Sequence, residues 1–416
     1  MTPIAFRNVS SKMVTAIDIG GSKVSCIIAA RREVENVPVI LGIGHHGIQS
    51  VKKGEALTLD IMESAILHAV HKAEKEAGTL VKEAVINITG NHLLSEIVSV
   101  SVRTHSHRIG DQEIANLIAQ GTQTRSSDTF TVLHANPIQF AIDDGPMVKD
   151  PRGMYGNILK GYLHVVTGDL NPTRTLVHCL QRCHINITSI VPSSIASGLS
   201  TLVEDEMELG VILVDLGSRS TNVSVFRDGE VIHTECLPLG SNHITSDLAY
   251  GLSTSFSAAE RIKVLYGSAV ETTDDARIMV EVPSFNDPHR EHDHIVPRSL
   301  ITAIIKPRME EILELVKTHL EKSDVHKMTS RRVVITGGGS QLSGLRELAQ
   351  DILQKQVRLG RPLDLFKSSQ PYAVPSLATC TGLLTFAFRQ NYSETNSGGT
   401  RRAWVQSVMG WLKDNF

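Results

Sequence analysis

The chain has 416 residues, of which 41% are hydrophobic and 20% charged, and its formal net charge is −3. This length allows roughly two to four compact units, each with its own core. A charge so close to zero gives no general reason to expect nucleic acid as a partner. Five scattered cysteines suit a reducing cytoplasm better than a disulfide framework.

Neither end of the sequence favours a secreted or membrane-spanning chain. Residues 1–13 lack the apolar run of a signal peptide. The longest apolar stretch near the other end, Leu377–Phe388, is too short to cross a bilayer. We therefore expect a chain without a transmembrane segment.

The first predicted element is a β-hairpin over Val14–Ala29, whose turn has the composition of a phosphate site. An acid, two glycines, a hydroxyl and an amine follow the first strand: Asp18, Gly20, Gly21, Ser22 and Lys23. Glycines let successive N–H groups point at one anion, while the acid can hold the water shell of a magnesium ion. The lysine adds a positive charge. The turn thus predicts a polyphosphate site, with an ordinary hairpin as the alternative.

A glycine pattern of the G-x-G-x-x-G type starts at Gly42, a spacing typical of dinucleotide-binding folds. That fingerprint needs a helix that opens at the glycines, yet helical periodicity starts only near residue 60. We therefore do not favour a Rossmann site. The helix predicted over Asp60–Ala77 begins with a capping box of Asp60 and Glu63.

The pattern changes between Leu93 and Leu170, where alternating strands flank a short helix after Asp111. This pattern predicts a small α+β subdomain inserted into the first half of the chain. A helix follows near Pro172, and its histidines and cysteines have a spacing that metals use. Because no second cysteine pair accompanies them, we favour an amphipathic helix with partly buried thiols.

The second half begins with another hairpin, Val211–Phe226, which repeats the arrangement of the first. An acid, a glycine and hydroxyls again follow an apolar strand: Asp215, Gly217, Ser218, Ser220 and Thr221. Two such turns at matched positions predict a duplicated fold. Helices are expected at His243–Leu252 and Ser257–Tyr266, the second with a capping box of Ser257 and Glu260. A polar loop, Pro283–Pro297, precedes a long helix.

A glycine run, Gly337–Gly339, separates a strand at Arg332–Thr336 from a helix predicted over Gln341–Gln354. Bare backbone at a helix N-terminus lets a ligand lie against Gly337, Gly338 and Gly339, although no Walker lysine follows. The last globular helix is expected to end at Phe388, and a polar linker spans residues 389–400.

The final segment, residues 401–416, predicts an amphipathic helix that lies in a membrane interface. Its basic and apolar residues at helical spacing include Arg401, Arg402, Trp404, Val405, Val408, Trp411, Leu412 and Phe416. Tryptophans and arginines suit an anionic bilayer surface. The alternative is a terminal helix packed on the protein's own core.

Three loops together, Asp18–Lys23, Asp215–Thr221 and Val334–Ser340, resemble the phosphate-1, phosphate-2 and adenosine motifs of the actin, Hsp70 and sugar-kinase superfamily. The helix Pro375–Phe388 is similar to its second connecting helix. Residues 257–267 are similar to the helix in bacterial actins whose Glu and Lys approach the ribose and adenine, here Glu260 and Lys263. Glu260 capping its own helix is the competing interpretation.

The inserted subdomain, the polar linker and the terminal segment together resemble the FtsA family of bacterial cell-division proteins. The resemblance implies an α/β, actin-like duplicated fold with two halves around a nucleotide cleft. It also implies ATP and Mg²⁺ as ligands, with Asp18 and Asp215 facing the metal through water. The residues expected around the nucleotide are Asp18, Gly20, Gly21, Ser22, Lys23, Asp215, Gly217, Ser218, Ser220, Glu260, Lys263, Gly337, Gly338 and Gly339.

The same resemblance implies a scaffold that polymerises and tethers the tubulin-like protein FtsZ to the cytoplasmic face of the membrane at the division site. Implied partners are FtsZ, bound through residues 241–298, further copies of the chain, anionic lipid and other division proteins, but no nucleic acid. Phosphate-2 loops usually read Gly-Gly or Gly-Ser where this chain has Ser218-Arg219. Arg219 either neutralises phosphate or excludes the attacking water, so at most a slow ATPase is expected.

Two alternatives remain open at this point. The first is a small-molecule kinase of the sugar-kinase superfamily, which would need a catalytic acid in a substrate pocket and would have no use for the tail. The second is an actin-like pilus or cell-shape scaffold, in which a different subdomain is expected in place of the inserted one.

Overall fold

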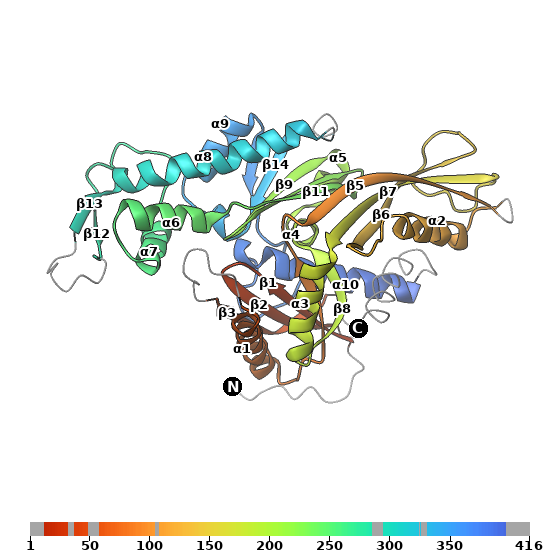
Figure 1. The fold of residues 1–416 in the computed structure, drawn as a ribbon, viewed down its shortest axis with the longest axis horizontal. Coiled ribbons are helices and arrows are strands. Elements are labelled where there is room, and N and C mark those ends of the chain that lie inside the picture. Colours follow the sequence, from red (N-terminus) through yellow and green to blue (C-terminus); the bar gives the residue numbers. More distant parts are fainter. Residues whose placement is uncertain are drawn as a thin grey trace. The chain divides into compact units, whose positions relative to one another are not determined.

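The computed structural model describes residues 12–31, 37–48, 58–104, 108–284, 294–323, 325 and 331–396. The predicted membrane segment, residues 401–416, lies outside these ranges. The chain divides into two compact units, Met1–Thr201 with Pro362–Phe416, and Leu202–Arg361. Figure 1 labels the elements along the chain.

Unit 1 is built on a five-stranded sheet with the strand order β3-β2-β1-β4-β8. β1 pairs antiparallel with β2, and β2 with β3, whereas β4 and β8 run parallel to β1. The bounds of its strands and helices are β1 Lys12–Ile19, β2 Lys23–Arg31, β3 Val39–Gly47, α1 Leu59–Ala77, β4 Glu83–Ile88, α3 Leu170–Arg182, β8 Asn186–Pro192, α4 Ser193–Thr201 and α10 Ala378–Asn396. The first predicted hairpin is therefore confirmed.

Helix α1 packs closely on the sheet because two glycines of β3 leave room for it. A Cβ at Gly42 would lie 2.2 Å from the carbonyl oxygen of Ala73, and one at Gly44 would lie 1.8 Å from that of Ala69. The first two glycines of the G-x-G-x-x-G pattern thus serve helix-on-sheet packing, whereas a Cβ at Gly47 would meet nothing within 4 Å. The helix begins after Thr58, whose hydroxyl accepts the Ile61 N–H, so the predicted capping box is wrong.

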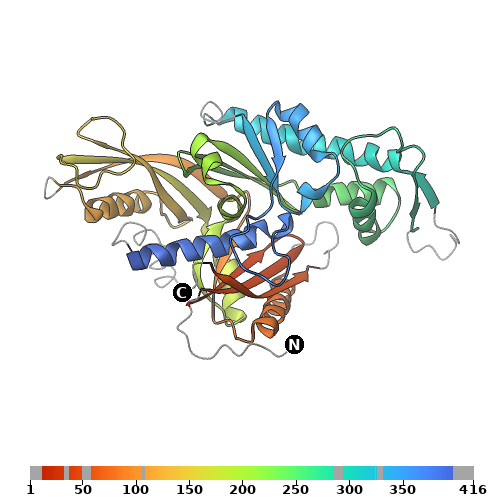
Figure 2. The same ribbon diagram turned by 180° about the vertical axis from the view of Figure 1, so that it is seen from behind.

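Helix α10 lies on the other face of the same sheet from α1, as Figure 2 shows from behind. It crosses α4 so closely that a Cβ at Gly382 would lie 1.8 Å from the carbonyl oxygen of Ala196. The helix continues to Asn396, beyond the end expected at Phe388. The prediction of a linker from residue 389 onward is therefore wrong for residues 389–396, which are helical.

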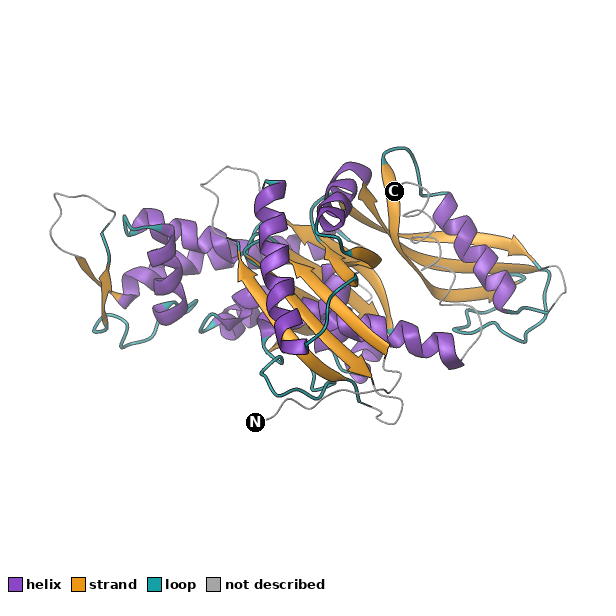
Figure 3. Ribbon diagram, turned by 90° about the horizontal axis from the view of Figure 1, so that it is seen from below, coloured by secondary structure: helices purple, strands orange, loops and turns teal. Residues whose placement is uncertain are grey.

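The inserted subdomain of unit 1 is a three-stranded antiparallel sheet, in the order β5-β7-β6, with helix α2 across one face (Figure 3). Its elements are β5 Leu93–Arg103, α2 Asp111–Gln123, β6 Phe130–Ile142 and β7 Ile158–Asp169. A glycine again allows the helix to pack close to the sheet, since a Cβ at Gly161 would lie 2.6 Å from the side chain of Leu117 on α2. The predicted small α+β insertion is therefore present.

Unit 2 repeats the architecture of the first sheet with the order β11-β10-β9-β14-β15. β9, β10 and β11 are antiparallel neighbours, and β14 and β15 run parallel to β9, so the same sequence of pairings recurs. Its elements are α5 Glu204–Leu209, β9 Val211–Leu216, β10 Thr221–Arg227, β11 Glu230–Leu237, α6 Ser241–Gly251, α7 Phe256–Tyr266, β12 Met279–Val282, β13 His294–Pro297, α8 Arg298–Lys322, β14 Arg332–Thr336, η2 Gly338–Gln341, α9 Leu345–Leu353 and β15 Gln356–Leu359.

Two predicted element boundaries in unit 2 need correction. Part of the polar loop expected at residues 283–297 is a strand, because β13 pairs antiparallel with β12. The helix expected to follow the glycine run directly begins only at Leu345. The intervening residues form a short 3₁₀ turn, and then Ser343 bridges Ser268, with the Ala269 N–H donating to the Ser343 carbonyl at 2.8 Å. That main-chain bridge interrupts the helix.

Candidate functional site

The turn between β1 and β2 is closed by the main chain. Asp18 lies opposite Ser25 and Ile19 opposite Val24 in the ladder. The Gly20 N–H donates to the Lys23 carbonyl at 3.0 Å. A Cβ at Gly20 would lie 3.0 Å from that oxygen, which is tighter than ordinary van der Waals contact. The residues that the sequence predicts to surround a phosphate therefore share one tight turn.

Opposite charges lie at this turn on partly buried side chains. Asp18 is 9% exposed, and Lys23 is half-buried. Burial lowers the pKa of the Lys23 ammonium, and the nearby Asp18 carboxylate opposes that shift. An anionic ligand interacts more strongly with a partly buried cation than with a fully exposed cation, because water screens the charges less. The pair can thus act on a phosphate and on the metal that accompanies it.

Asn87, at the end of β4, supports the first turn and was not among the residues predicted from the sequence. Its Oδ1 accepts the Ile19 N–H at 2.7 Å, and its Nδ2 donates to the Ser193 Oγ at 2.9 Å. The Ser193 hydroxyl donates in turn to the Ile88 carbonyl at 3.2 Å. Asn87 is 3% exposed. The available signal was an amide side chain within an apolar strand, since such a group needs buried partners.

The turn between β9 and β10 has the same register and the same closing bond as the first turn. Asp215 lies opposite Asn222, and the Gly217 N–H donates to the Ser220 carbonyl at 3.0 Å. Asp215 and Gly217 therefore occupy the places of Asp18 and Gly20, and Ser220 replaces Lys23. Arg219 is exposed at the tip of this turn. The matched hairpins expected from the sequence are confirmed.

The glycine run meets the second turn within unit 2. β14 runs parallel to β9 and places Thr336 opposite Asp215. Gly337 has φ +86°, and a Cβ there would lie 2.3 Å from the Asp215 Oδ1. A Cβ at Gly339 would lie 2.6 Å from the Leu216 side chain. Only glycine fits this close approach, so the loop presents bare backbone beside the acid.

The start of α6 holds the second turn from another side. The Ser241 N–H donates to the Gly217 carbonyl at 2.9 Å, and the Asn242 N–H donates to the Ser218 carbonyl at 2.7 Å. Gly240 leaves room for this contact, since a Cβ there would lie 2.7 Å from the Ser218 oxygen. These main-chain partners carry no sequence signal and were not predicted.

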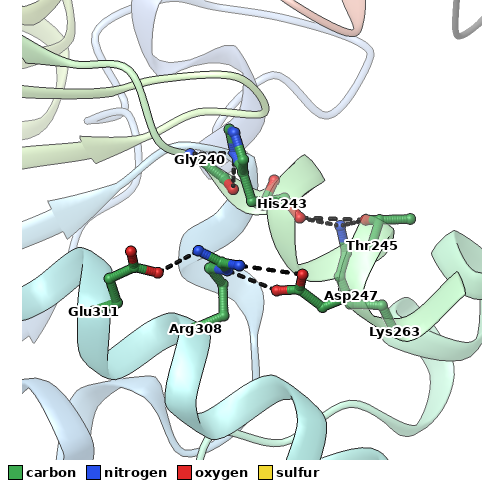
Figure 4. A network of polar contacts seen from close by, with 8 residues as sticks. Gly240, His243, Thr245, Asp247, Lys263, Arg308 and Glu311 are labelled. Carbon is green, nitrogen blue, oxygen red and sulfur yellow. Dashed lines mark hydrogen bonds and ion pairs between the residues drawn. The ribbon is translucent and has the colours of Figure 1, made fainter. Parts of the chain in front are cut away.

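Glu260 and Lys263 lie on α7 and bond to one another at 2.6 Å. Helix α7 begins after Ser255, whose Oγ accepts the Ala258 N–H at 3.2 Å. Glu260 is therefore too far along the helix to form the predicted capping box with Ser257, and that interpretation is wrong. The Glu260 Oε2 accepts hydrogen bonds from the Lys263 ammonium and from the Thr245 hydroxyl, the second at 2.5 Å. Figure 4 shows the Lys263 ammonium directed at Thr245 and the start of α6.

Two kinds of feature are absent from the described part of the chain. Among the residues that the structure describes, no three His, Cys, Asp or Glu side chains are grouped so as to hold a metal ion. Across the described ranges, no helix is long and apolar enough to cross a membrane.

Comparison with known proteins places these features in a family. The family model of the cell division protein FtsA matches residues 212–382, and that of the SHS2 domain inserted in FtsA matches residues 90–167. The second range coincides closely with the insertion expected at residues 93–170.

Two curated relatives match almost over their whole length. The cell division protein FtsA of Agrobacterium fabrum is 35% identical over 425 residues, covering 98% of this chain and 95% of that protein. The protein of the same name from Pseudomonas aeruginosa is 30% identical over 417 residues, covering 98% and 99%.

Solved structures bear out the fold. A chain of the PilM-PilN type IV pilus biogenesis complex has a TM-score of 0.62 at 15% identity, covering 90% of this chain and 98% of that one. MreB5 of Spiroplasma citri bound to ADP has a TM-score of 0.53 at 12% identity, covering 93% and 99%. The predicted α/β, actin-like fold with an inserted subdomain is thus confirmed. The chain belongs to the family of the cell division protein FtsA.

Proposed function

We propose that this chain binds ATP with Mg²⁺ and that the turns between β1 and β2 and between β9 and β10 contact its phosphates. The observation that carries this proposal is the repeated bond from Gly20 to Lys23 and from Gly217 to Ser220, each beside an acid. Asp18 and Asp215 supply oxygen donors of the kind that magnesium prefers, usually with water and phosphate completing its shell. The ADP named for MreB5, a protein with a similar fold, supports a nucleotide ligand.

The remaining contacts are proposed for the adenosine end of the nucleotide. The backbone of Gly337–Gly339 has no side chains that would keep a ligand away. The Glu260–Lys263 pair stands on α7, and the Glu260 side chain is 42% exposed. A carboxylate in this position suits ribose hydroxyls, which donate hydrogen bonds.

Hydrolysis is proposed to be slow, with ATP acting mainly as a structural ligand. Arg219 occupies the tip of the second turn, where other phosphate-2 loops have a small residue. Holding a nucleotide needs only binding, whereas hydrolysis also needs a positioned water. Steady-state phosphate release well below about 1 per second is expected. A turnover at or above that rate would contradict this role for Arg219.

For the division role, we propose that the chain polymerises and tethers FtsZ to the cytoplasmic face of the membrane, together with other division proteins. Residues 241–298 are the proposed FtsZ contact. Exposed apolar side chains are frequent there and include Tyr250 at 90%, Val264 at 71%, Leu265 at 57%, Met279 at 56% and Ile295 at 63% exposure. Exposed Arg261 lies among them and suits an acidic, apolar peptide.

The proposed membrane anchor is the segment 401–416, with its two tryptophans and flanking arginines. One short tail should hold a monomer only reversibly, and a polymer that carries many tails should gain avidity by roughly 10²–10⁴.

Co-sedimentation with FtsZ on anionic liposomes tests the proposed tether between FtsZ and the membrane. The intact chain is expected to carry FtsZ to the vesicles. Deleting residues 403–416 should release both proteins while ATP binding remains. Charge reversal at Arg261 is expected to release FtsZ alone. If FtsZ still sediments with the vesicles when residues 403–416 of this chain are deleted, the proposed tether is wrong.

A further inference from the structure

Each of the two hairpin turns has a buried polar side chain directly across the ladder from its acid. In unit 1, Ser25 of β2 lies opposite Asp18 of β1. In unit 2, Asn222 of β10 lies opposite Asp215 of β9. Ser25 is 0% exposed and Asn222 is 7% exposed. Directly opposed residues of antiparallel strands share a face of the sheet, with Cβ atoms about 4.5–5.5 Å apart. The repeat therefore places a hydrogen-bond donor next to each acid.

Ser25 faces the side of the sheet that helix α10 covers. Its neighbours along β2, Val24 and Cys26, belong to one core cluster with Ile66 of α1. Because side chains alternate along a strand, Ser25 points to the opposite face. On that face the Cys380 thiol of α10, itself 0% exposed, lies 3.6 Å from the Ser25 carbonyl oxygen. The Ser25 side chain is thus enclosed between the sheet and α10.

The Ser25 hydroxyl is a burden on the ligand-free fold. Among the residues that the structure describes, no group lies within hydrogen-bond distance of its Oγ. A hydroxyl that leaves water without gaining a protein partner destabilises the folded state. Alanine, which β2 carries at positions 29 and 30, would avoid this cost. Side chains that lower stability in this way are typical of functional sites.

The Asp18 carboxylate is an acceptor that the Ser25 hydroxyl can serve. A carboxylate has two oxygens with about four acceptor positions, so it can face a metal ion and still accept another bond. Carboxylates at metal sites are generally held in orientation by hydrogen bonds from neighbouring groups. Asp18 is 9% exposed, which leaves little room for solvent to supply such a bond. The Ser25 hydroxyl, on the next strand and the same face, is a buried donor beside it.

We propose that Ser25 is a positioning residue for magnesium, whose hydroxyl donates to the Asp18 carboxylate in the Mg·ATP-bound chain and holds it toward the metal and its water shell. This inference rests on the proposed binding of ATP with Mg²⁺. It predicts that removal of the hydroxyl has opposite effects on two properties. The ligand-free chain becomes more stable, and the metal-dependent part of ATP binding becomes weaker. A hydroxyl with a purely structural role would not weaken binding through the metal.

Thermal unfolding without nucleotide or metal tests the first effect. Ser25→Ala should raise the midpoint of unfolding by roughly 2 °C, because it removes a buried hydroxyl that has no partner. Thr381→Val is the matched control on α10, where the buried Thr381 Oγ1 also lacks a hydrogen-bond partner among the described residues. It should raise the midpoint similarly. A lower midpoint in Ser25→Ala than in the intact chain would show that the hydroxyl has a structural partner, and would overturn the proposal.

Calorimetric titration of ATP, once with excess magnesium and once with EDTA, tests the second effect. Ser25→Ala should weaken Mg·ATP about fivefold and keep the affinity for metal-free ATP within about twofold. Thr381→Val should keep both affinities within about twofold. Unchanged Mg·ATP affinity in Ser25→Ala, or equal weakening with and without metal, would overturn the proposal. If the intact chain binds no Mg·ATP, the proposed ATP function itself fails and this role fails with it, which is distinct from a loss of metal dependence alone.

Discussion

The two hairpin turns share one main-chain bond but are held in place differently. In unit 1 the Ile48 N–H donates to the Ser22 carbonyl at 2.7 Å, and a side chain from the neighbouring strand, Asn87, also accepts the Ile19 amide. In unit 2 the corresponding strand position is Thr336, whose hydroxyl donates to the Gly360 carbonyl at 3.1 Å, away from the turn. There the turn is held by main-chain amides of α6 and by the approach of Gly337. The two repeats thus share the hairpin turn but differ in the contacts that hold it.

This difference decides which substitutions each turn can tolerate. Support by a side chain fails when one functional group is removed. Support by backbone fails when a Cβ is added, because the space next to the acid is already filled. Three substitutions exploit this contrast, and their expected effects decrease from the first to the last.

Gly337→Ala should damage unit 2 most. The new Cβ would lie 2.3 Å from the Asp215 Oδ1, at a residue with φ +86°. Clash and backbone strain together should lower the free energy of unfolding by about 3 kcal/mol. Urea unfolding measures this, with Gly47→Ala as the control, since nothing lies within 4 Å of a Cβ there. Equal free energies of unfolding for the two variants would contradict the close approach of Gly337 to Asp215.

Asn87→Leu should damage the first turn and leave the second intact. The substitution leaves the Ile19 N–H without its acceptor, which costs about 1–3 kcal/mol and should weaken Mg·ATP about tenfold or more. Thr336→Val, the matched change in unit 2, should keep affinity within about twofold. Calorimetric titration of both variants is the measurement. A larger loss in Thr336→Val would reverse the contrast.

Ser193→Ala should have the smallest effect, because it acts on the first turn through Asn87. The Asn87 Nδ2 loses its acceptor at 2.9 Å while Oδ1 keeps the Ile19 N–H. A loss of about 1 kcal/mol, or about fivefold in Mg·ATP affinity, is expected. The same titration applies, and an effect as large as that of Asn87→Leu would contradict the smaller, indirect role of Ser193.

Local patterns predicted much of this protein. Strand, acid and glycine follow one another within a few residues, so both hairpins are evident from the amino-acid order alone. The inserted subdomain is visible as a change from helical to alternating periodicity. The family resemblance then supplied the fold, because the three loops occur together.

The remaining features depend on contacts between distant segments. Asn87 lies 68 positions from Ile19, and nothing near it in sequence indicates which amide it meets. The capping boxes failed because Thr58 and Ser255, earlier hydroxyls, start the helices instead. The helix after the glycine run starts late because Ser343 bridges Ser268.

Calorimetric titration of Mg·ATP into the intact chain and into Asp18→Ala, Lys23→Ala and Asp215→Ala variants tests phosphate binding by the two turns most directly. Each removed group acts on phosphate or its metal, where a charge-assisted contact is worth about 1.5–3 kcal/mol. We expect every variant to bind at least about tenfold more weakly than the intact chain. Unchanged affinity in the variants of either turn would show that this turn does not bind the nucleotide.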